Sequence, residues 1–164
     1  MQFTPHPITL TPLSRNDLPR VSHIIVAPDQ VRFSGTVREA FEADEADVDF
    51  HGVFADDHAV GFFKIDRRFH KRMGFAKRGE LGLRAFLIDL SQQGKGYATA
   101  AVAALPAYLP RHYPKAPAIV LTVNMINPPA IACYRKGGFR DTGQVYPHGQ
   151  AGPQHVMRMR LGAT

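Results

Sequence analysis

Residues 83–109, LRAFLIDLSQQGKGYATAAVAALPAYL, decide the fold that the sequence predicts. Residues 83–90 are apolar except for two charged positions, which is typical of a buried strand. Residues 91–96 form a polar turn with two glycines, and from Tyr97 apolar residues recur at helical spacing up to Leu109. A strand, a glycine turn and a helix in this order direct unpaired backbone N–H groups at the positive end of the helix dipole. The sequence therefore predicts a site for a phosphate or pyrophosphate group.

The glycine turn can be compared with three kinds of anion-binding turn. The P-loop pattern GxxxxGK[ST] does not occur, and the dinucleotide pattern GxGxxG fails because Thr99 stands at its last glycine. The string QGKGYA at residues 93–98 matches the pattern Gln/Arg-x-x-Gly-x-Gly/Ala at every fixed position. This turn resembles the acetyl-CoA pyrophosphate site of the GCN5-related N-acetyltransferase (GNAT) superfamily.

A second motif lies at residues 127–139, NPPAIACYRKGGF. It resembles the acetyltransferase pattern N-x-x-A-x-x-x-Y-x-K-x-G-F. Every fixed residue is present at its spacing: Asn127, Ala130, Tyr134, Lys136, Gly138 and Phe139. With both motifs in the family's order, the chain is identified as a member of the GNAT superfamily. Residues 26–33 and 138–161 resemble its spermine/spermidine (diamine) acetyltransferase-like branch most.

Composition limits the class of protein. The 164 residues, 45% hydrophobic and 21% charged, are typical of one globular domain over residues 1–164. No apolar run approaches the ~20 residues of a membrane span. Residues 1–13 lack the features of a signal peptide, so we expect a cytoplasmic protein without membrane contact. The single cysteine, Cys133, excludes an internal disulfide, and no zinc spacing is present, so we expect no metal.

The resemblance implies the GNAT fold, an α+β (mixed α/β) architecture with about four helices around a mostly antiparallel mixed sheet of about six to seven strands. The residue patterns predict strands at 8–13, 48–54, 59–66, 83–90, 118–124, 140–145 and 154–161. They predict helices that begin at Ser14, at Ser34 or Thr36, at Tyr97 and at Asn127.

Several of these helices have predicted ends. The first has a capping box of Ser14 and Asp17 and buries Val21, Ile24 and Ile25, and we expect Pro28 and Asp29 to end it. We expect residues 110–117 to break the helix that begins at Tyr97, and Gly137 and Gly138 to end the last one.

Membership of the superfamily implies transfer of an acetyl group from acetyl-CoA to a primary amine by direct attack in a ternary complex. Tyr134 matches the tyrosine that lies near the CoA sulfur, so we expect it to act as the general acid. Glu80 and Asp89 are the candidates for the general base. The cofactor-binding residues that the resemblance implies are Leu87, Ile88, Asp89, Leu90, Gln93, Gly94, Lys95, Gly96, Tyr97, Ala98, Thr99, Asn127, Tyr134 and Lys136.

Two charged stretches leave alternatives open. The acidic stretch at residues 39–49 is either a solvated face or a docking surface for a cationic substrate. The basic stretch at residues 67–78 is either a solvated connection or part of a nucleic-acid surface, although no nucleic-acid motif accompanies it. The net charge of +6 suits an anionic cofactor as well as a nucleic acid.

The acceptor that we expect is a small-molecule or peptide amine, and a homodimer is an open alternative to a monomer. The alternative function is a non-catalytic acetyl-CoA sensor or a basic nucleic-acid-binding module on the same fold. The presence of Tyr134 favours the enzyme, because a binding module needs no acid beside the sulfur.

Overall fold

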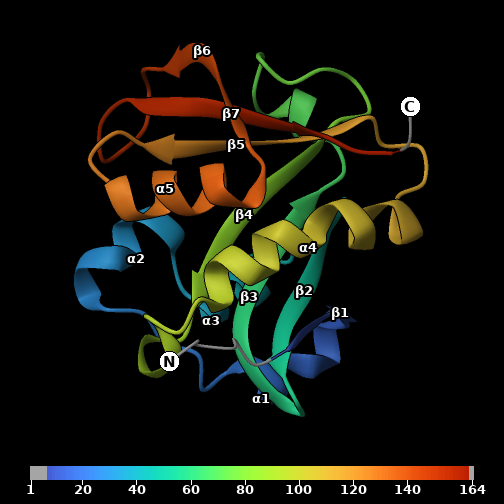
Figure 1. Cartoon of the computed structure of the whole chain (residues 1–164), viewed down its shortest axis with the longest axis vertical. Helices are drawn as coiled ribbons and strands as arrows, with labels where there is room; N and C mark the ends of the chain where they lie inside the picture. The colour runs from blue at the N-terminus through green and yellow to red at the C-terminus, as the bar shows by residue number, and fades with distance from the viewer. Residues whose placement is uncertain (1–6, 163–164) are drawn as a thin grey trace, which may run out of the picture.

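The computed structural model describes residues 7–162 and contains one seven-stranded sheet (Figure 1). The strands lie in the order β1-β2-β3-β4-β5-β7-β6. Their bounds are β1 (Ile8–Leu13), β2 (Val48–Ala55), β3 (His58–Asp66), β4 (Leu81–Ile88), β5 (Ala118–Asn124), β6 (Arg140–Tyr146) and β7 (Gln154–Arg160). Only the β4–β5 pair is parallel among the described strands. The predicted mixed, mostly antiparallel sheet is confirmed. The prediction that residues 1–13 are not a signal peptide falls partly on residues 1–6, which lie outside the described residues.

Five α-helices occur in the described part of the chain, and α1 is a single turn. Their bounds are α1 (Leu18–Val21), α2 (Pro28–Ser34), α3 (Val37–Ala43), α4 (Tyr97–His112) and α5 (Pro128–Gly137). The helices α4 and α5 cover one face of the sheet, the face nearer the viewer in Figure 1. The opposite face of β2 and β3 is covered by α1 and α3, and α2 lies beside β4.

Apolar side chains bury both faces of the sheet. On one face, Leu105 and Leu109 of α4 belong to the same buried cluster as Phe63 of β3 and Leu121 of β5. On the other face, Val37 and Ala40 of α3 join a cluster that contains Phe50 and Phe62. Burial on both faces explains why the central strands read as nearly continuous apolar runs.

The first helical region differs from its prediction. The capping box is present, because the Ser14 N–H donates to the Asp17 carboxylate over 2.7 Å and the Ser14 hydroxyl accepts from the Asn16 N–H over 3.2 Å. However, α1 ends at Val21, and the side chain of Ile25 is 61% exposed rather than buried. Pro28 begins α2 and does not end a helix, because proline lacks only an N–H that the first turn leaves unpaired anyway.

Two other predicted bounds were wrong. The helix α4 continues past Pro110 to His112, because Tyr108 and Leu109 remain buried and the Tyr113 N–H still donates to the Leu109 carbonyl over 2.7 Å. Packing here outweighs the hydrogen bond that a proline removes. Strand β4 spans Leu81–Ile88 and not residues 83–90; Leu90 begins a 3₁₀ turn and is 45% exposed.

The sheet opens between β4 and β5. These strands pair only at Leu81 with Ile119 and at Gly82 with Val120, although both continue further. The register between β3 and β4 shifts after Phe62, and Ala85 takes a left-handed φ of 52°. The bulge turns β4 away from its parallel neighbour, so backbone groups on that edge of β4 are left without a strand partner.

Candidate active site

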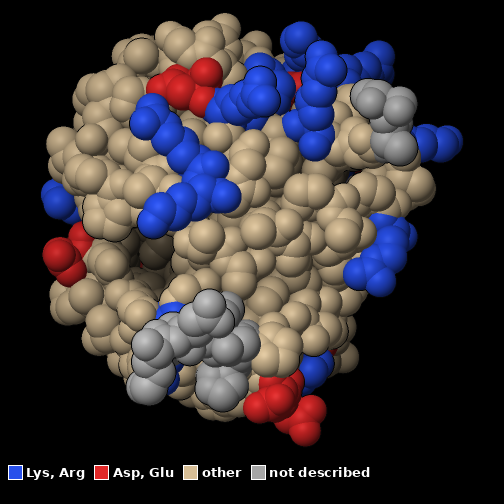
Figure 2. All heavy atoms as spheres, in the orientation of Figure 1, with Lys and Arg blue, Asp and Glu red and all other residues tan. Residues whose placement is uncertain are grey.

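A cavity of about 540 Å³ occupies the space between the diverging strands. Its walls come from residues 83–88 of β4, from the end of β5, from the turn before α4 and from one side of α5. Residues of α2, including Gln30 and Phe33, close another side. Figure 2 shows a hollow in the surface beside α2 and α5. The cavity is therefore open to solvent beside α2 and α5.

The glycine turn lies at one end of this cavity. Gly94 and Gly96 line it with φ angles of 80° and 84°, which a residue with a Cβ adopts only with strain. The first backbone bond of α4 is from the Ala100 N–H to the Gly96 carbonyl over 3.0 Å. The N–H groups of residues 97–99 thus have no helical acceptor, and the helix N-terminus carries a partial positive charge. This end of the cavity is suited to a pyrophosphate.

The side chain of Gln93 fixes the shape of the turn. Its amide nitrogen donates to the Ile88 carbonyl over 3.0 Å and to the Gln30 side chain over 3.1 Å. It thereby connects the end of β4 and helix α2 to the turn.

The cavity brings together most of the cofactor-binding residues that the sequence predicts. Those that line it are Leu87, Ile88, Gln93, Gly94, Gly96, Tyr97, Ala98, Thr99, Asn127 and Tyr134. Those that do not line it are Asp89, Leu90, Lys95 and Lys136. Asn127 occupies the N-cap position of α5, but its side chain makes no capping hydrogen bond.

Tyr134 projects from α5 into the wall of the cavity. Its ring meets the ring of Phe86 from β4 edge-on, with 6.1 Å between centroids, and that of Phe139 at 5.7 Å. Burial raises the pKa of the Tyr134 hydroxyl well above its usual range, and the neighbouring Cys133 thiol acts in the same direction. The hydroxyl therefore keeps its proton at neutral pH and can act as a proton donor.

The two predicted bases lie elsewhere. Glu80 is 4% exposed and accepts hydrogen bonds from Arg158 at 2.9 and 3.1 Å and from the Lys77 N–H at 2.7 Å. Asp89 accepts from the Ile25 N–H at 3.0 Å and from the Ser91 hydroxyl at 2.7 Å. Neither carboxylate lines the cavity, and both hold loops in place. In this structure neither is placed beside the cavity, and the identity of the general base stays a prediction.

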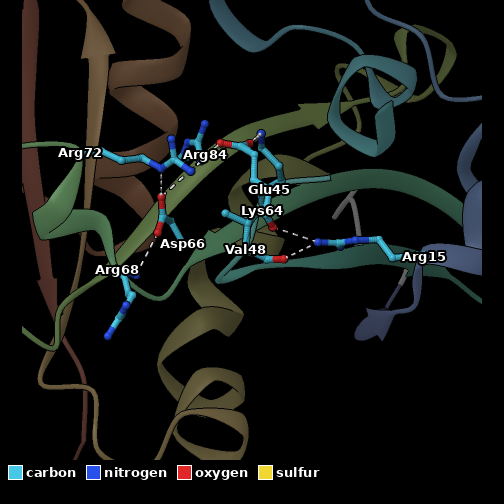
Figure 3. Close-up of polar contacts among 8 residues, drawn as sticks. All are labelled: Arg15, Glu45, Val48, Lys64, Asp66, Arg68, Arg72 and Arg84. Carbon is cyan, nitrogen blue, oxygen red and sulfur yellow. Dashed lines mark hydrogen bonds and ion pairs between the residues drawn. The ribbon is translucent and has the colours of Figure 1, made fainter. Parts of the chain in front are cut away.

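An ionic cluster joins Glu45, which precedes β2, to Lys64 of β3 and Arg84 of β4 (Figure 3). Glu45 contacts Lys64 at 2.8 Å, Arg72 at 2.7 Å and Arg84 at 3.1 Å. Asp66 contacts the same two arginines at 2.7 and 3.2 Å. Burial alone would raise the pKa of Glu45, but hydrogen bonds from Lys64 and Arg84 lower it to about 2. Glu45 therefore stays ionised at neutral pH.

The charges of the acidic and basic stretches partly neutralise each other. Arg67 contacts Asp47 at 3.7 Å and Asp49 at 3.1 Å, and Arg68 contacts Asp47 at 3.9 Å. In these pairs and in the cluster around Glu45, carboxylates of the acidic stretch are bound to arginines of the basic stretch. These charges are therefore less available for docking a cationic substrate or a nucleic acid. They favour the interpretation of both stretches as structural connections.

Sequence reasoning missed several residues of the cavity. They are Gln30, Phe33, Phe69, Met73, Arg84, Thr122, Asn124, Cys133 and Gln154. The available signal was a polar residue inside a run of apolar ones: Arg84 interrupts β4 and Asn124 ends β5. Gly82 allows the ring of Phe69 to pack against β4, because a Cβ there would clash with that ring; this contact is visible only in the structure.

Two general findings concern the part of the chain that the structure describes. No helix among these residues is both long enough and apolar enough to cross a bilayer. Residues 7–162 also contain no group of three or more His, Cys, Asp or Glu side chains placed to hold a metal ion.

The geometry agrees with a comparison of sequences. Residues 18–139 match the model of the Acetyltransferase (GNAT) family, which covers more than half of the chain. The chain belongs to this family. The acetyltransferase is 29% identical over 140 residues to "Uncharacterized N-acetyltransferase YbbJ" of Bacillus subtilis (strain 168), which covers 84% of this chain and 88% of the relative. The protein is thus an acyl-CoA-dependent N-acetyltransferase.

Solved structures show the same fold. The aminoglycoside acetyltransferase AAC(6')-Ib, in complex with coenzyme A and kanamycin, matches this acetyltransferase with a TM-score of 0.74 and 20% identity over 94% of this chain and 95% of that chain. A chimera of the spermidine N-acetyltransferase SpeG from Vibrio cholerae matches with a TM-score of 0.69 and 18% identity, over 93% and 95%. At these identities the likeness concerns the fold, and the resemblance to the polyamine branch stays a prediction.

Proposed function

We propose that the protein transfers the acetyl group of acetyl-CoA to a primary amine by direct attack in a ternary complex, with Tyr134 as the general acid. One observation carries the proposal: an anion-binding turn and a protonated tyrosine hydroxyl line the same cavity. The turn can bind the anionic pyrophosphate of acetyl-CoA. The tyrosine hydroxyl can supply a proton to the thiolate that leaves the thioester.

The donor half of the site supports this assignment through its backbone. The unpaired N–H groups at residues 97–99 would hold the pyrophosphate, and backbone groups on the edge of β4 that faces β5 would pair with the amides of pantetheine. The same free edge offers donors for the thioester oxygen, which becomes negatively charged during attack. Side chains contribute shape at this end, and the backbone contributes the hydrogen bonds.

The chemical step makes modest demands on the protein. The amine attacks as the neutral base, the C–N bond forms as the C–S bond breaks, and the departing thiolate takes a proton from the Tyr134 hydroxyl. The nitrogen then loses its extra proton to give the amide, and this proton restores the Tyr134 hydroxyl. A thiol with a pKa near ~8.5 is a fair leaving group, so a weak acid suffices. No carboxylate among the described residues lines the cavity, so the proton of the incoming ammonium would leave through water at the open side. Binding both substrates together supplies the remaining rate enhancement.

The test is release of the CoA thiol from acetyl-CoA across a panel of amines that includes spermidine, kanamycin, a lysine peptide and amino acids. We expect release with one class of amine and a large loss in Tyr134→Phe. Binding of acetyl-CoA without release for any amine would contradict the proposal and favour the sensor. Release that is equally fast in the variant would contradict the role of Tyr134.

A further inference from the structure

The half of the cavity remote from the glycine turn has its own chemistry. Strand β4 runs away from the turn, and Arg84 lies four residues before Ile88, which corresponds to about 13 Å along a strand. Phe86, which meets Tyr134, lies between them. If the pyrophosphate occupies the turn and the thioester lies near Tyr134, the amine substrate occupies the remaining end, beside Arg84.

This end lacks the groups that bind polycations. Among the described residues that line the cavity, Arg84 is the only one with a charged side chain. Spermidine and aminoglycosides carry several ammonium groups, whose burial requires carboxylate partners. The nearest carboxylates, Glu45 and Asp66, are already paired with Arg84 and with other cations. The charge inventory of the cavity thus disfavours polycationic acceptors.

Arg84 has hydrogen-bonding capacity left over. Its Nη1 is bound by Glu45 and Asp66, whereas its Nε and Nη2 have no acceptor among the described residues. Figure 3 shows the guanidinium held against Asp66 and Glu45, with Arg72 beside it. In the cluster three basic side chains, Lys64, Arg72 and Arg84, share two carboxylates, and burial lowers the pKa of Lys64. A fixed guanidinium with free donors is the group that binds carboxylates best.

Asn124 supplies an independent second observation. It ends β5, is only 4% exposed and lines the same cavity. Its Oδ1 accepts from the Ile126 N–H over 2.9 Å, which fixes the orientation of the amide. Its buried Nδ2 has no hydrogen-bond partner in the described protein. Because an unpaired buried donor is costly, such a group is a candidate for binding water, an ion or a ligand.

We infer that the acceptor amine also carries a carboxylate, which Arg84 and Asn124 bind while the amine faces the thioester. Phe33, Phe69 and Met73 line the same cavity, so the body of this acceptor is apolar. The acceptor class is therefore an amino acid or a similar amino carboxylate with an apolar side chain. The inference rests on the proposed acetyl transfer and names the substrate class of that site.

The experiment compares acceptors that differ only in the carboxylate. L-phenylalanine is paired with 2-phenylethylamine, and L-leucine with 3-methylbutylamine, with spermidine and kanamycin beside them. Thiol release from acetyl-CoA gives kcat/KM for each. We expect at least one amino acid to exceed its decarboxylated partner by about tenfold or more, as a charge-assisted hydrogen bond predicts. The gain should come mainly through KM.

Variants assign the preference to the two residues. In Arg84→Gln, the ratio of kcat/KM for the amino acid to kcat/KM for its decarboxylated amine should fall towards one. Arg84→Lys should retain part of the preference for the amino acid. Asn124→Asp keeps the acceptor for the Ile126 N–H but replaces the free donor with an anion, so it should lower the ratio further. Arg78→Gln removes the same charge from an exposed position outside the cavity and should leave the ratio unchanged.

Three results would overturn the inference. One is faster reaction of the decarboxylated amines, of spermidine or of kanamycin in the unmodified protein, a result that needs no variant. Another is release with other amines of the panel but with no member of either pair. The third is a ratio that Arg84→Gln leaves intact. In each of these cases amines are acetylated, so the proposed function stands. Absence of release with any amine, while acetyl-CoA binds, would instead contradict the proposed function itself.

Discussion

The ring of Tyr134 in α5 meets the ring of Phe86 in β4 edge-on across the cavity, with 6.1 Å between the centroids. The contact joins a helix to a strand that has separated from its parallel neighbour. It sets the position of the tyrosine hydroxyl independently of any hydrogen bond, because the ring is held by Phe86 and Phe139.

Tyr134→Phe should separate packing from proton donation. The ring contacts remain, so the melting temperature and the affinity for acetyl-CoA should stay close to those of the unmodified protein. Turnover should fall by about 10²-fold, the scale of a lost general acid. Tyr146→Phe, outside the cavity, is the control. Thiol-release kinetics at saturating acetyl-CoA measure the effect, and an unchanged kcat would remove Tyr134 from the mechanism.

Gly96→Asp should abolish binding of acetyl-CoA, because it places a negative charge at the site of the pyrophosphate. Gly96→Asn is the matched control, since asparagine has the same shape and tolerates the left-handed φ of 84°. Titration calorimetry should give a much weaker affinity for the aspartate variant than for the asparagine variant. Equal affinities would move the pyrophosphate away from this turn.

Glu80→Gln tests the role of a residue that the sequence offered as a base and that the structure places in an ion pair with Arg158. The change weakens the contacts with Arg158 and should cost on the order of 1–3 kcal/mol of unfolding free energy. Its pH–rate profile should match that of the unmodified protein. Loss of the acidic limb of that profile would restore Glu80 as the base.

His51 should make the fold sensitive to acid. It is 2% exposed and lies 2.6 Å from the Tyr108 hydroxyl and 2.8 Å from the Tyr113 hydroxyl. Burial lowers the pKa of His51 from 6.5 to about 4, with Asp49 opposing this shift. The unfolded chain therefore takes up a proton at higher pH than the folded one.

The sign of the effect follows from this difference in proton binding. Above about pH 6.5, His51 is neutral in both states and does not lower the free energy of unfolding. As the pH falls from about 6.5 to about 4, that free energy decreases by on the order of 3 kcal/mol. Urea unfolding at pH 7, 5.5 and 4 measures it. In His51→Gln this part of the pH dependence should disappear; if the variant shows the same slope, other groups cause the acid sensitivity.

Gly137→Ala should destabilise the contact between α5 and α4, because a Cβ at this position would clash with the Val102 side chain. The expected cost is about 1–3 kcal/mol, typical of overpacking. Val102→Ala in the same chain should recover part of it, since the space is then available. Thermal unfolding of the two single variants and the double variant gives the coupling; simple additivity would contradict the clash.

Much of the fold follows from local patterns. Strand β5 coincides with its prediction because its apolar run is short and rich in β-branched residues, which favours a buried strand over a helix. Pro28 and Pro110 were misleading for one reason: proline is compatible with the first turn of a helix and, where packing is strong, with its last turn. Sequence alone does not say which of these a given proline occupies.

The glycine turn that lines one end of the cavity was also visible in the sequence, because glycine spacing and helix polarity specify it. The other end of the cavity, beside Arg84, was not. The bulge at Ala85 carries no glycine signal, and it decides which side chains of β4 reach the cavity. Glu80 and Asp89 are near the site in sequence, yet they bind Arg158 and the Ile25 N–H. Such pairings join residues far apart in the chain, so no local pattern predicts them.

The separation of β4 from β5 has a consequence for how this protein can change. One half of the cavity presents main-chain groups, so a substitution there leaves the hydrogen-bonding pattern intact as long as it keeps the N–H and the backbone conformation, including the left-handed φ angles of Gly94 and Gly96. The other half presents the side chains of Arg84, Phe69 and Phe33, each replaceable by a single codon change. A lineage that keeps this backbone can therefore acquire a new amine partner without rebuilding the part that holds the acyl donor.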